Sequence, residues 1–402
     1  MSEYIAAADA LSLILDQIRP TCRQESVPLD QTVGRILAES IDAQRDAPPF
    51  RRAAIDGYAF RSQDTPGTLN VVGTIVAGTI WSKPLNPGDA VRIMTGAFVP
   101  TECDTVLEQE AVQGGRTIAV VKTIKSDRNI MQQGHEYLKG TRIFEAGTPI
   151  GPIALGQMAG LGLATIPVLI KPRVLVLVTG NEVVRGGTVL PAGHIYDATG
   201  PLLKALIDEL GATATVRYGR DDKRSLYQSL ARAGHTYDLV ITTGGVSVGI
   251  RDYLPEVLSQ HFQRLFWRVD MHPGKAMAAG LIRPGLPVLS LSGNPGATLT
   301  AWYLIVAPVV AKLLGQPYQL KSITGHLIHE YPKATRETRY LKAHFIKHAD
   351  GYGFDVSVNQ SSDAIRSFQD ADGLVVIPHK SPPQQEGAVV QGLFLPGRSL
   401  GQ

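Results

Sequence analysis

The stretch Val174-Leu-Val-Leu-Val-Thr-Gly-Asn-Glu182 decides the fold of this chain. Its five leading apolar residues, followed by a glycine turn, are typical of a strand buried on both faces of a parallel sheet. Similar runs alternate with helical segments from Lys171 to Gly315, which predicts a doubly wound parallel sheet. We predict strands at Val174–Val178, Thr213–Tyr218, Asp238–Thr242, Leu265–Val269, Met277–Leu281 and Val288–Leu291, and helices at Pro201–Leu210 and Arg224–Ala233.

The chain of 402 residues exceeds the length of about 250–300 residues at which one hydrophobic core stops growing. Helices are predicted at Ile5–Ile18, shortly after Asp30, and at Ala154–Leu161, where the helix is expected to pack against the N-terminal one. Short β-rich runs lie between Val71 and Thr123. We expect an α/β multidomain protein with an N-terminal helical linker domain (1–46 and 139–170), an inserted small β domain (47–138), the doubly wound domain (171–317) and a C-terminal β-barrel-like domain (318–402).

Composition narrows the class of partner. A formal net charge of +3 is too small to indicate nucleic acid, but it is compatible with a small anionic ligand. The start of the chain has no basic and apolar signal pattern, and Cys22 and Cys103 have no metal-ligand spacing, so we expect a cytoplasmic protein. The apolar segment Ala297–Leu314 contains Pro308 and follows a glycine turn, which favours a buried core helix over a membrane span.

Glycine-rich turns follow several of the predicted strands. In an open parallel sheet, ligands bind beyond the carboxyl ends of the strands, where such turns expose backbone N–H groups. None of the turns matches a P-loop or a dinucleotide-binding fingerprint. The turns are Thr179-Gly-Asn-Glu182, Thr243-Gly-Gly-Val-Ser-Val-Gly249, His272-Pro-Gly-Lys275 and Ser292-Gly-Asn-Pro-Gly296.

Acidic residues are expected on the same edge of the sheet. Carboxylates beside a phosphate group are favourable when a hard cation such as Mg²⁺ bridges them, so the pattern suggests metal-assisted chemistry on a phosphate ester or anhydride. Asp197 and Asp222 are also candidate helix N-caps, a role compatible with a place in the site. Lys275 can pair with a phosphate or another oxyanion. The acidic residues are Glu182, Asp197, Asp221, Asp222 and Asp252.

Two motifs far from the sheet in sequence also stand out. In Arg51-Arg-Ala-Ala-Ile-Asp-Gly-Tyr-Ala59, two cations precede the carboxylate of Asp56 in a turn that contains a glycine. In Ile93-Met-Thr-Gly-Ala97, Thr95 offers a hydroxyl group at the end of a strand. Each motif taken alone is equally compatible with an ordinary surface turn.

Taken in order, these motifs resemble the molybdopterin molybdenumtransferase family of the MoeA type, which also forms the C-terminal half of gephyrin. The resemblance covers essentially the whole chain. The motifs that carry it are Asp56-Gly-Tyr-Ala59, Arg92-Ile-Met-Thr-Gly-Ala97, Gly134-His-Glu136, Gly180-Asn-Glu182, Ile195-Tyr-Asp197, Asp221-Asp222, Gly244-Gly-Val-Ser-Val-Gly249 with Asp252-Tyr253, Pro273-Gly-Lys275 and Gly293-Asn-Pro295.

The resemblance implies that adenylated molybdopterin and molybdate are converted to molybdenum cofactor with release of AMP, assisted by Mg²⁺. It implies a homodimer in which the doubly wound domain of one subunit and the β domain of the other form the site. An upstream molybdopterin adenylyltransferase is implied as a partner, with molybdoenzyme maturation proteins as further candidates. The implied catalytic residues are Asp56, Thr95, Glu182, Asp252 and Lys275, the metal ligands are Glu182, Asp221 and Asp252, and the substrate-binding residues are Gly180, Asp197, Asp221, Asp222, Gly244, Gly245, Ser247, His272, Gly274, Ser292, Gly293 and Asn294.

Several residues depart from the family pattern. His272 and Ala276 replace a basic residue and a proline around Pro-Gly-Lys, and Ser292 and Gly296 replace a proline and a valine around Gly-Asn-Pro, while Glu136 replaces an aspartate. An imidazole in place of a permanent charge weakens oxyanion binding or makes it pH-dependent. A tungstate-preferring variant and a non-catalytic pterin-binding or scaffold protein are therefore the alternative hypotheses.

Overall fold

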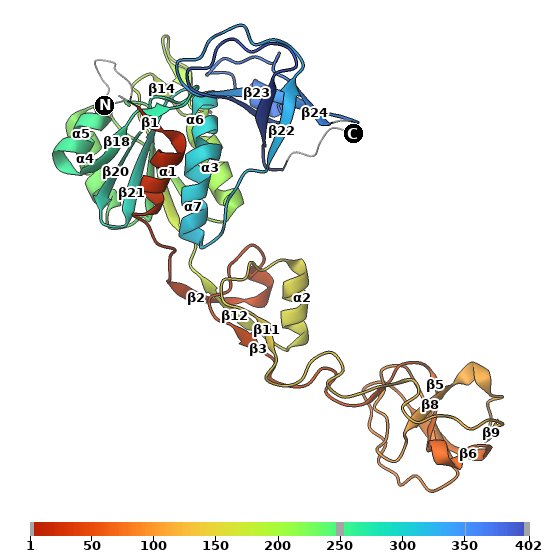
Figure 1. Ribbon diagram of the computed structural model, residues 1–402. Coiled ribbons are helices and arrows are strands. Elements are labelled where there is room, and N and C mark those ends of the chain that lie inside the picture. Colours follow the sequence, from red (N-terminus) through yellow and green to blue (C-terminus); the bar gives the residue numbers. More distant parts are fainter. Residues whose placement is uncertain (1–3, 247–252, 350, 398–402) are drawn as a thin grey trace. The chain divides into compact units, whose positions relative to one another are not determined.

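The computed structural model describes residues 4–246, 253–349 and 351–397 (Figure 1). The chain divides into two compact units. The first comprises Met1–Glu25, Gly34–Ile36 and Val168–Gln402, and the second comprises Ser26–Val33 and Leu37–Pro167. The doubly wound domain and the C-terminal domain both belong to the first unit.

The central sheet of the first unit has six strands in the order β16-β13-β17-β21-β20-β18. The four strands β16, β13, β17 and β21 run parallel, as predicted, whereas β20 is antiparallel to both β21 and β18. The expectation of a purely parallel sheet was wrong at this edge because only Pro284 and Gly285 join β20 to β21, and so short a turn connects antiparallel strands. The strands are β13 (Arg173–Val178), β16 (Thr213–Tyr218), β17 (Leu239–Thr243), β18 (Gln263–Trp267), β20 (Ala278–Arg283) and β21 (Leu286–Leu291).

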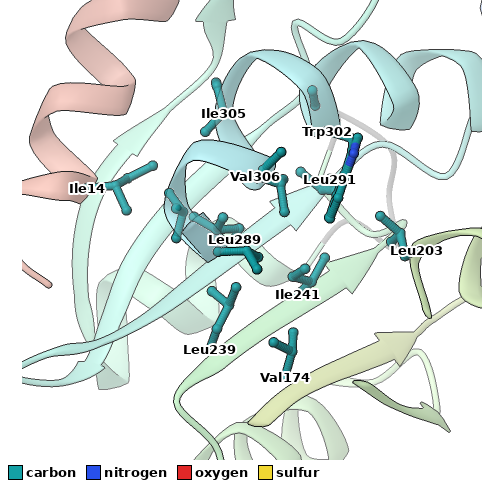
Figure 2. Packing of buried hydrophobic residues seen from close by; sticks show 14 of the residues in the cluster. Ile14, Val174, Leu203, Leu239, Ile241, Leu289, Leu291, Trp302, Ile305 and Val306 are labelled. Atoms are coloured by element: carbon teal, nitrogen blue, oxygen red, sulfur yellow. The ribbon is translucent and has the colours of Figure 1, made fainter. Parts of the chain in front are cut away.

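Helices cover both faces of this sheet. On one face, α1 (Ala7–Leu15), α3 (Thr199–Leu210) and the long helix near residue 300 enclose a core of aliphatic side chains around Trp302 (Figure 2). On the other face lie α4 (Lys223–Ala233) and α5 (Leu254–His261). The predicted bounds of α3 and α4 differ from these by one or two residues.

The N-terminal helix lies in the first unit rather than in a linker domain with residues 139–170. The strand β1 (Ile5–Ala6) pairs with β19 (Val269–Asp270), and α1 then packs against α7 with Ala10 and Ile14 fully buried. The helix α2 (Pro152–Gly160) packs against the 3₁₀ helix η1 (Leu29–Gln31) instead. The buried apolar stripe of α1 does not by itself specify which segment covers it, and within the first unit α7 does so. The expected packing of α1 against α2 stays a prediction.

A single apolar helix of 20 residues, Pro295–Leu314, crosses the first unit and is largely buried. It consists of α6 (Pro295–Ala301), a π-helical segment η4 (Trp302–Val306) and α7 (Ala307–Leu314). Pro308 lacks an N–H group and crowds the preceding turn, which accounts for the wider π-helical register just before it. Of the described residues, only this helix is long and apolar enough to span a membrane, and its burial fits the predicted core helix.

The second unit contains a five-stranded sheet in the order β8-β5-β7-β6-β9. The β-rich runs expected between Val71 and Thr123 coincide with β6, β7, β8 and β9, except that the runs ending at Met94 and Val121 extend one residue beyond β7 and β9. The short helix expected after Asp30 does not form: the one-turn η1 contains Asp30 and ends at Gln31, and Gly34 takes a φ of +78° that turns the chain. The strands are β5 (Gly57–Phe60), β6 (Gly67–Ile75), β7 (Asp89–Ile93), β8 (Thr105–Glu108) and β9 (Thr117–Val120), and the shorter pairs are β3 (Ile41–Asp42) with β11 (Arg142–Phe144) and β4 (Arg52–Ala53) with β10 (Ile130–Met131).

The C-terminal domain is a closed five-stranded barrel, as expected. Phe345, Phe354 and Phe394 fill its interior. Gly373 faces them, since a side chain there would meet the Phe345 ring at 2.2 Å. The strands, in the order β22-β24-β23-β25-β26, are β22 (Ser322–Leu327), β23 (Arg339–His348), β24 (Gly351–Asp355), β25 (Gly373–Ile377) and β26 (Val389–Phe394), with α8 (Arg366–Asp370) between β24 and β25.

Candidate anion-binding site

A cavity of about 360 Å³ lies at the carboxyl ends of β17 and β21 in the first unit. Three of the four predicted glycine turns line it, together with one residue of the C-terminal domain. The described lining residues are Gly244, Gly245, Val246, His272, Pro273, Gly274, Lys275, Ala276, Ser292, Gly293, Asn294, Ala297 and Ser362. The structure therefore gathers the segments that the sequence predicted at one edge of the sheet.

The close approach of two turns requires glycine at the cavity. Gly244 has a φ of +86°, and a Cβ atom there would lie 2.9 Å from the carbonyl oxygen of Thr179. A Cβ atom on Gly293 would lie 3.7 Å from the Cα of Gly244, an ordinary van der Waals contact, so glycine is required at Gly244 and not at Gly293. The amide of Gly244 already donates to the Leu291 carbonyl oxygen (3.0 Å), so this glycine contributes space rather than a donor.

Lys275 is the only side chain with a permanent charge among the described lining residues. Its Nζ lies 3.1 Å from Oε1 of Glu337, which precedes β23 of the C-terminal domain. The Lys275 side chain is 50% exposed and that of Glu337 only 14%, so the cation reaches the cavity while the carboxylate is largely enclosed.

His272 is half-buried beside Lys275. Burial lowers its pKa below the ordinary value, the charges of Arg339 and Lys275 lower it further, and Glu337 opposes them. The imidazole is therefore neutral at pH 7. The substitution at this position thus removes a positive charge from the cavity rather than replacing one cation with another.

Ser362 is a lining residue that the sequence did not reveal. Its hydroxyl oxygen accepts a hydrogen bond from Nδ2 of Asn294 (3.2 Å), and its carbonyl oxygen accepts one from the amide of Ala297 (3.1 Å). A Cβ atom on Gly296 would lie 2.8 Å from that carbonyl oxygen. The glycine that departs from the family pattern therefore lets the loop between β24 and α8 approach the first turn of α6.

The turn after β13 borders this cavity without lining it. The Thr179 hydroxyl group donates to the Thr243 carbonyl oxygen (2.8 Å), which ties this turn to the one at Gly244. Gly180 adopts a φ of +122°, and a Cβ atom there would lie 2.9 Å from Oε1 of Glu182. Glu182 is exposed.

Two of the predicted aspartates act as caps. Asp222 is the N-cap of α4 and accepts hydrogen bonds from the amide (2.8 Å) and hydroxyl group (2.7 Å) of Ser225. Asp197 follows the short pair β14 (Val183–Val184) and β15 (Ile195–Tyr196). It accepts from the amides of Thr199 and Gly200 at the start of α3. The N-cap interpretation is confirmed for Asp222, whereas the N-cap of α3 is Ala198 and Asp197 binds the first amides of that helix from one residue earlier.

Among the described residues, the predicted magnesium ligands do not form a preassembled metal site. Asp221 is half-buried, and its Oδ1 would lie 3.9 Å from a Cβ atom on Gly245. Within the described part of the chain, no group of three or more acidic, histidine or cysteine side chains forms a metal site. Asp252 and Ser247 lie outside the described residues. Mg²⁺ is usually held by one or two carboxylates together with substrate phosphates, which Glu182 and Asp221 fit.

Asp56 and Thr95 come together in the second unit. Oδ1 of Asp56 accepts hydrogen bonds from the hydroxyl group (2.6 Å) and the amide (2.7 Å) of Thr95. These bonds, first the one from the hydroxyl group, hold the pKa of Asp56 below its usual range. Two motifs 39 residues apart, at the ends of the paired strands β5 and β7, thus form one ionised carboxylate site.

The fold and the cavity define an α/β protein with a cavity lined by glycine turns and one lysine at the carboxyl edge of a doubly wound sheet. Comparison with known families makes this class specific. Residues 5–162 match the MoeA N-terminal region (domain I and II), residues 175–312 match a probable molybdopterin binding domain, and residues 325–395 match the MoeA C-terminal region (domain IV). The chain belongs to the MoeA family.

Curated relatives and solved structures agree with this family. A molybdopterin molybdenumtransferase from Staphylococcus epidermidis is 31% identical, with 98% of this chain and 97% of the relative covered. One from Staphylococcus aureus is 32% identical, with 96% and 94% covered. The crystal structure of a molybdopterin biosynthesis MoeA protein from Pyrococcus horikosii is similar with a TM-score of 0.85 at 30% identity, covering 98% of this chain and 100% of that one.

Proposed function

We propose that this chain inserts molybdenum into molybdopterin, converting adenylated molybdopterin and molybdate to molybdenum cofactor and AMP. The observation that carries the proposal is the cavity at the carboxyl ends of β17 and β21, which three glycine turns and Lys275 line in a chain of the MoeA family. Both substrates are anionic, and this edge of a doubly wound sheet is where such ligands bind.

The cavity's own residues hold an oxyanion in this proposal. Lys275 supplies the positive charge, and the hydroxyl group of Ser362 and the amide group of Asn294 supply hydrogen bonds. The first turn of the helix Pro295–Leu314 lines the cavity through Ala297, so the positive end of a 20-residue helix faces the anion. Together these groups orient molybdate or the terminal phosphate beside the reacting pterin.

Glu182 and Asp221, with Asp252, hold Mg²⁺ against the pyrophosphate linkage in this proposal. When bound, the cation neutralises the charge that develops on AMP as the anhydride breaks. Gly180, Gly244 and Gly245 leave room for the phosphates to approach the backbone of these turns. Asp197 and Asp222 contribute by fixing the starts of α3 and α4.

Asp56 and Thr95 complete the site from a second subunit in a homodimer. Their hydrogen bonds keep Asp56 ionised and oriented, which suits a carboxylate that binds a cation or accepts a proton. A second chain supplying this pair accounts for functional motifs that lie in a separate compact unit from Lys275.

The direct test incubates the full-length protein with adenylated molybdopterin, Mg²⁺ and molybdate, and measures the release of AMP and of molybdenum cofactor. Glu182→Gln and Asp252→Asn should each reduce AMP release by more than about 10-fold if they hold the cation. If the folded wild-type protein releases no AMP under these conditions, the proposal is refuted.

Mixing two inactive variants tests the composite site. In a heterodimer of Asp56→Asn and Lys275→Ala subunits, one of the two sites contains both wild-type residues. Random mixing should therefore restore about a quarter of wild-type activity when the site is shared between subunits. Absence of any recovery after subunit exchange places both residues in the same chain.

A second candidate function is non-catalytic binding of the pterin, or a preference for tungstate. The neutral His272 and the pairing of Lys275 with Glu337 favour it, because both reduce the positive charge offered to an oxyanion. Tight pterin binding without AMP release supports the carrier, and faster turnover with tungstate supports the variant specificity. In either case we expect the substrate to come from a cytoplasmic molybdopterin adenylyltransferase.

A further inference from the structure

The ion pair between Lys275 and Glu337 is the most unusual feature of the cavity. Lys275 carries the only permanent charge among the described lining residues, yet its ammonium group already has a carboxylate at 3.1 Å. An anion that enters must share this cation with Glu337 or displace it. The pair therefore affects binding before any chemistry begins.

Hydrogen bonds of Thr338 and Tyr340 hold the chain just after Glu337 against β19 and the turn that follows it. The amide of His272 donates to the Thr338 carbonyl oxygen (2.8 Å), and the amide of Tyr340 donates to the His272 carbonyl oxygen (2.9 Å). The hydroxyl group of Thr338 donates to Asp270 (3.0 Å). These bonds fix the backbone next to Glu337, while its side chain meets the cavity only through Lys275.

The charges around the pair give Glu337 a defined electrostatic role. Arg339 and Lys275 both lower the pKa of His272, so two cations lie near this imidazole, and Glu337 is the anion that opposes them. Like charges brought together at a binding site repel each other, which lowers affinity and affects selectivity. The carboxylate of Glu337 therefore repels the same anionic ligands that Lys275 attracts.

We propose that Glu337 is an internal counter-ion of Lys275 that an incoming oxyanion displaces, and that it sets the affinity of the cavity for such ligands. The identity of the oxyanion rests on the proposed function, whereas the competition between Glu337 and the oxyanion for Lys275 does not. Glu337 keeps Lys275 neutralised and oriented in the empty cavity. It weakens the binding of free oxyanions and favours ligands with enough charge to compete.

The experiment measures binding of sodium molybdate to the full-length protein by isothermal titration calorimetry, with tungstate and sulfate as comparators. Glu337→Gln keeps the shape and a hydrogen bond to Lys275 but removes the negative charge, so it should bind molybdate about 10-fold more tightly. Glu330→Gln, which removes an exposed charge from the same domain, is the matched control and should bind as the wild type does.

A double variant separates competition for Lys275 from general repulsion. In a Lys275→Met background, Glu337→Gln should change molybdate affinity by less than about 2-fold, because the shared cation is gone. Molybdate binding by Glu337→Gln that is weaker than or equal to that of the wild type overturns the inference. A 10-fold gain in molybdate affinity in the Lys275→Met background also overturns it, as does the absence of molybdate binding by both the wild type and Glu337→Gln. If the variants show the expected molybdate affinities but the wild-type protein releases no AMP, the proposed function is refuted and the role of Glu337 is not.

Discussion

Replacing Gly296 with alanine tests how tightly the C-terminal domain packs against the cavity. The new Cβ atom would lie 2.8 Å from the Ser362 carbonyl oxygen, 3.2 Å from the Ser362 carbonyl carbon and 3.5 Å from the Ser361 carbonyl oxygen. All three are backbone atoms, so no side-chain rotation relieves the contact. The loop that carries Ser362 must therefore move away from α6.

Two opposing effects set the magnitude. Overpacking of this kind costs about 1–3 kcal/mol, and the hydrogen bond from the amide of Ala297 to Ser362 contributes about 1 kcal/mol more when it is lost. Replacing a helical glycine with alanine returns about 0.5–1 kcal/mol. We expect Gly296→Ala to lower the free energy of unfolding by about 1–3.5 kcal/mol.

The assay is calorimetric unfolding of the full chain, with Gly156→Ala as the matched control. Gly156 lies in α2 with nothing within 4 Å of its added Cβ atom, so this change should leave stability equal or raise it by about 0.5–1 kcal/mol. Gly296→Ala should also weaken molybdate binding, because Ser362 retreats from the cavity. Equal or increased stability in Gly296→Ala refutes the close packing inferred here.

Three further predictions concern ionised groups. Burial lowers the pKa of Lys342 from 10.5 to about 8, so the unfolded chain binds more protons between these values and stability should rise with pH across this window; in Lys342→Met that rise should be absent from equilibrium unfolding. Thr95→Val removes a donor to Asp56 and should raise the pKa of this carboxyl group, as measured by NMR titration; an unchanged value contradicts the assigned bond. Asp222→Ala removes the N-cap of α4 and should cost about 1 kcal/mol in urea unfolding, and a Ser225→Ala change in the same background should add little.

The strands of the doubly wound domain could be predicted because each one is a short apolar run that ends in a turn. The antiparallel edge was missed although Pro284-Gly285 indicated a tight turn, because apolar runs alone do not show strand direction. The location of α1 was also missed. An amphipathic helix shows that it buries a stripe, but the stripe fits any apolar surface, and here that surface belongs to α7.

The glycine turns of the site were predictable for a physical reason. Turns that follow parallel strands meet at one edge, so local sequence places them together. Ser362 and Glu337 had no comparable signal, because Ser362 lines the cavity and Glu337 pairs with Lys275 through contacts between distant segments. A carboxylate repels an oxyanion, so sequence reasoning does not predict an acidic residue such as Glu337 beside an oxyanion site.

The charges of the cavity indicate how it discriminates between ligands. With His272 neutral and Lys275 paired, little net positive charge remains to attract an anion from a distance. Affinity then depends on short-range groups, namely the first turn of α6 and the hydrogen-bonding side chains of Asn294 and Ser362. Such groups act only on a ligand that fits between the turns, so they select by shape and by hydrogen-bond geometry more than by charge.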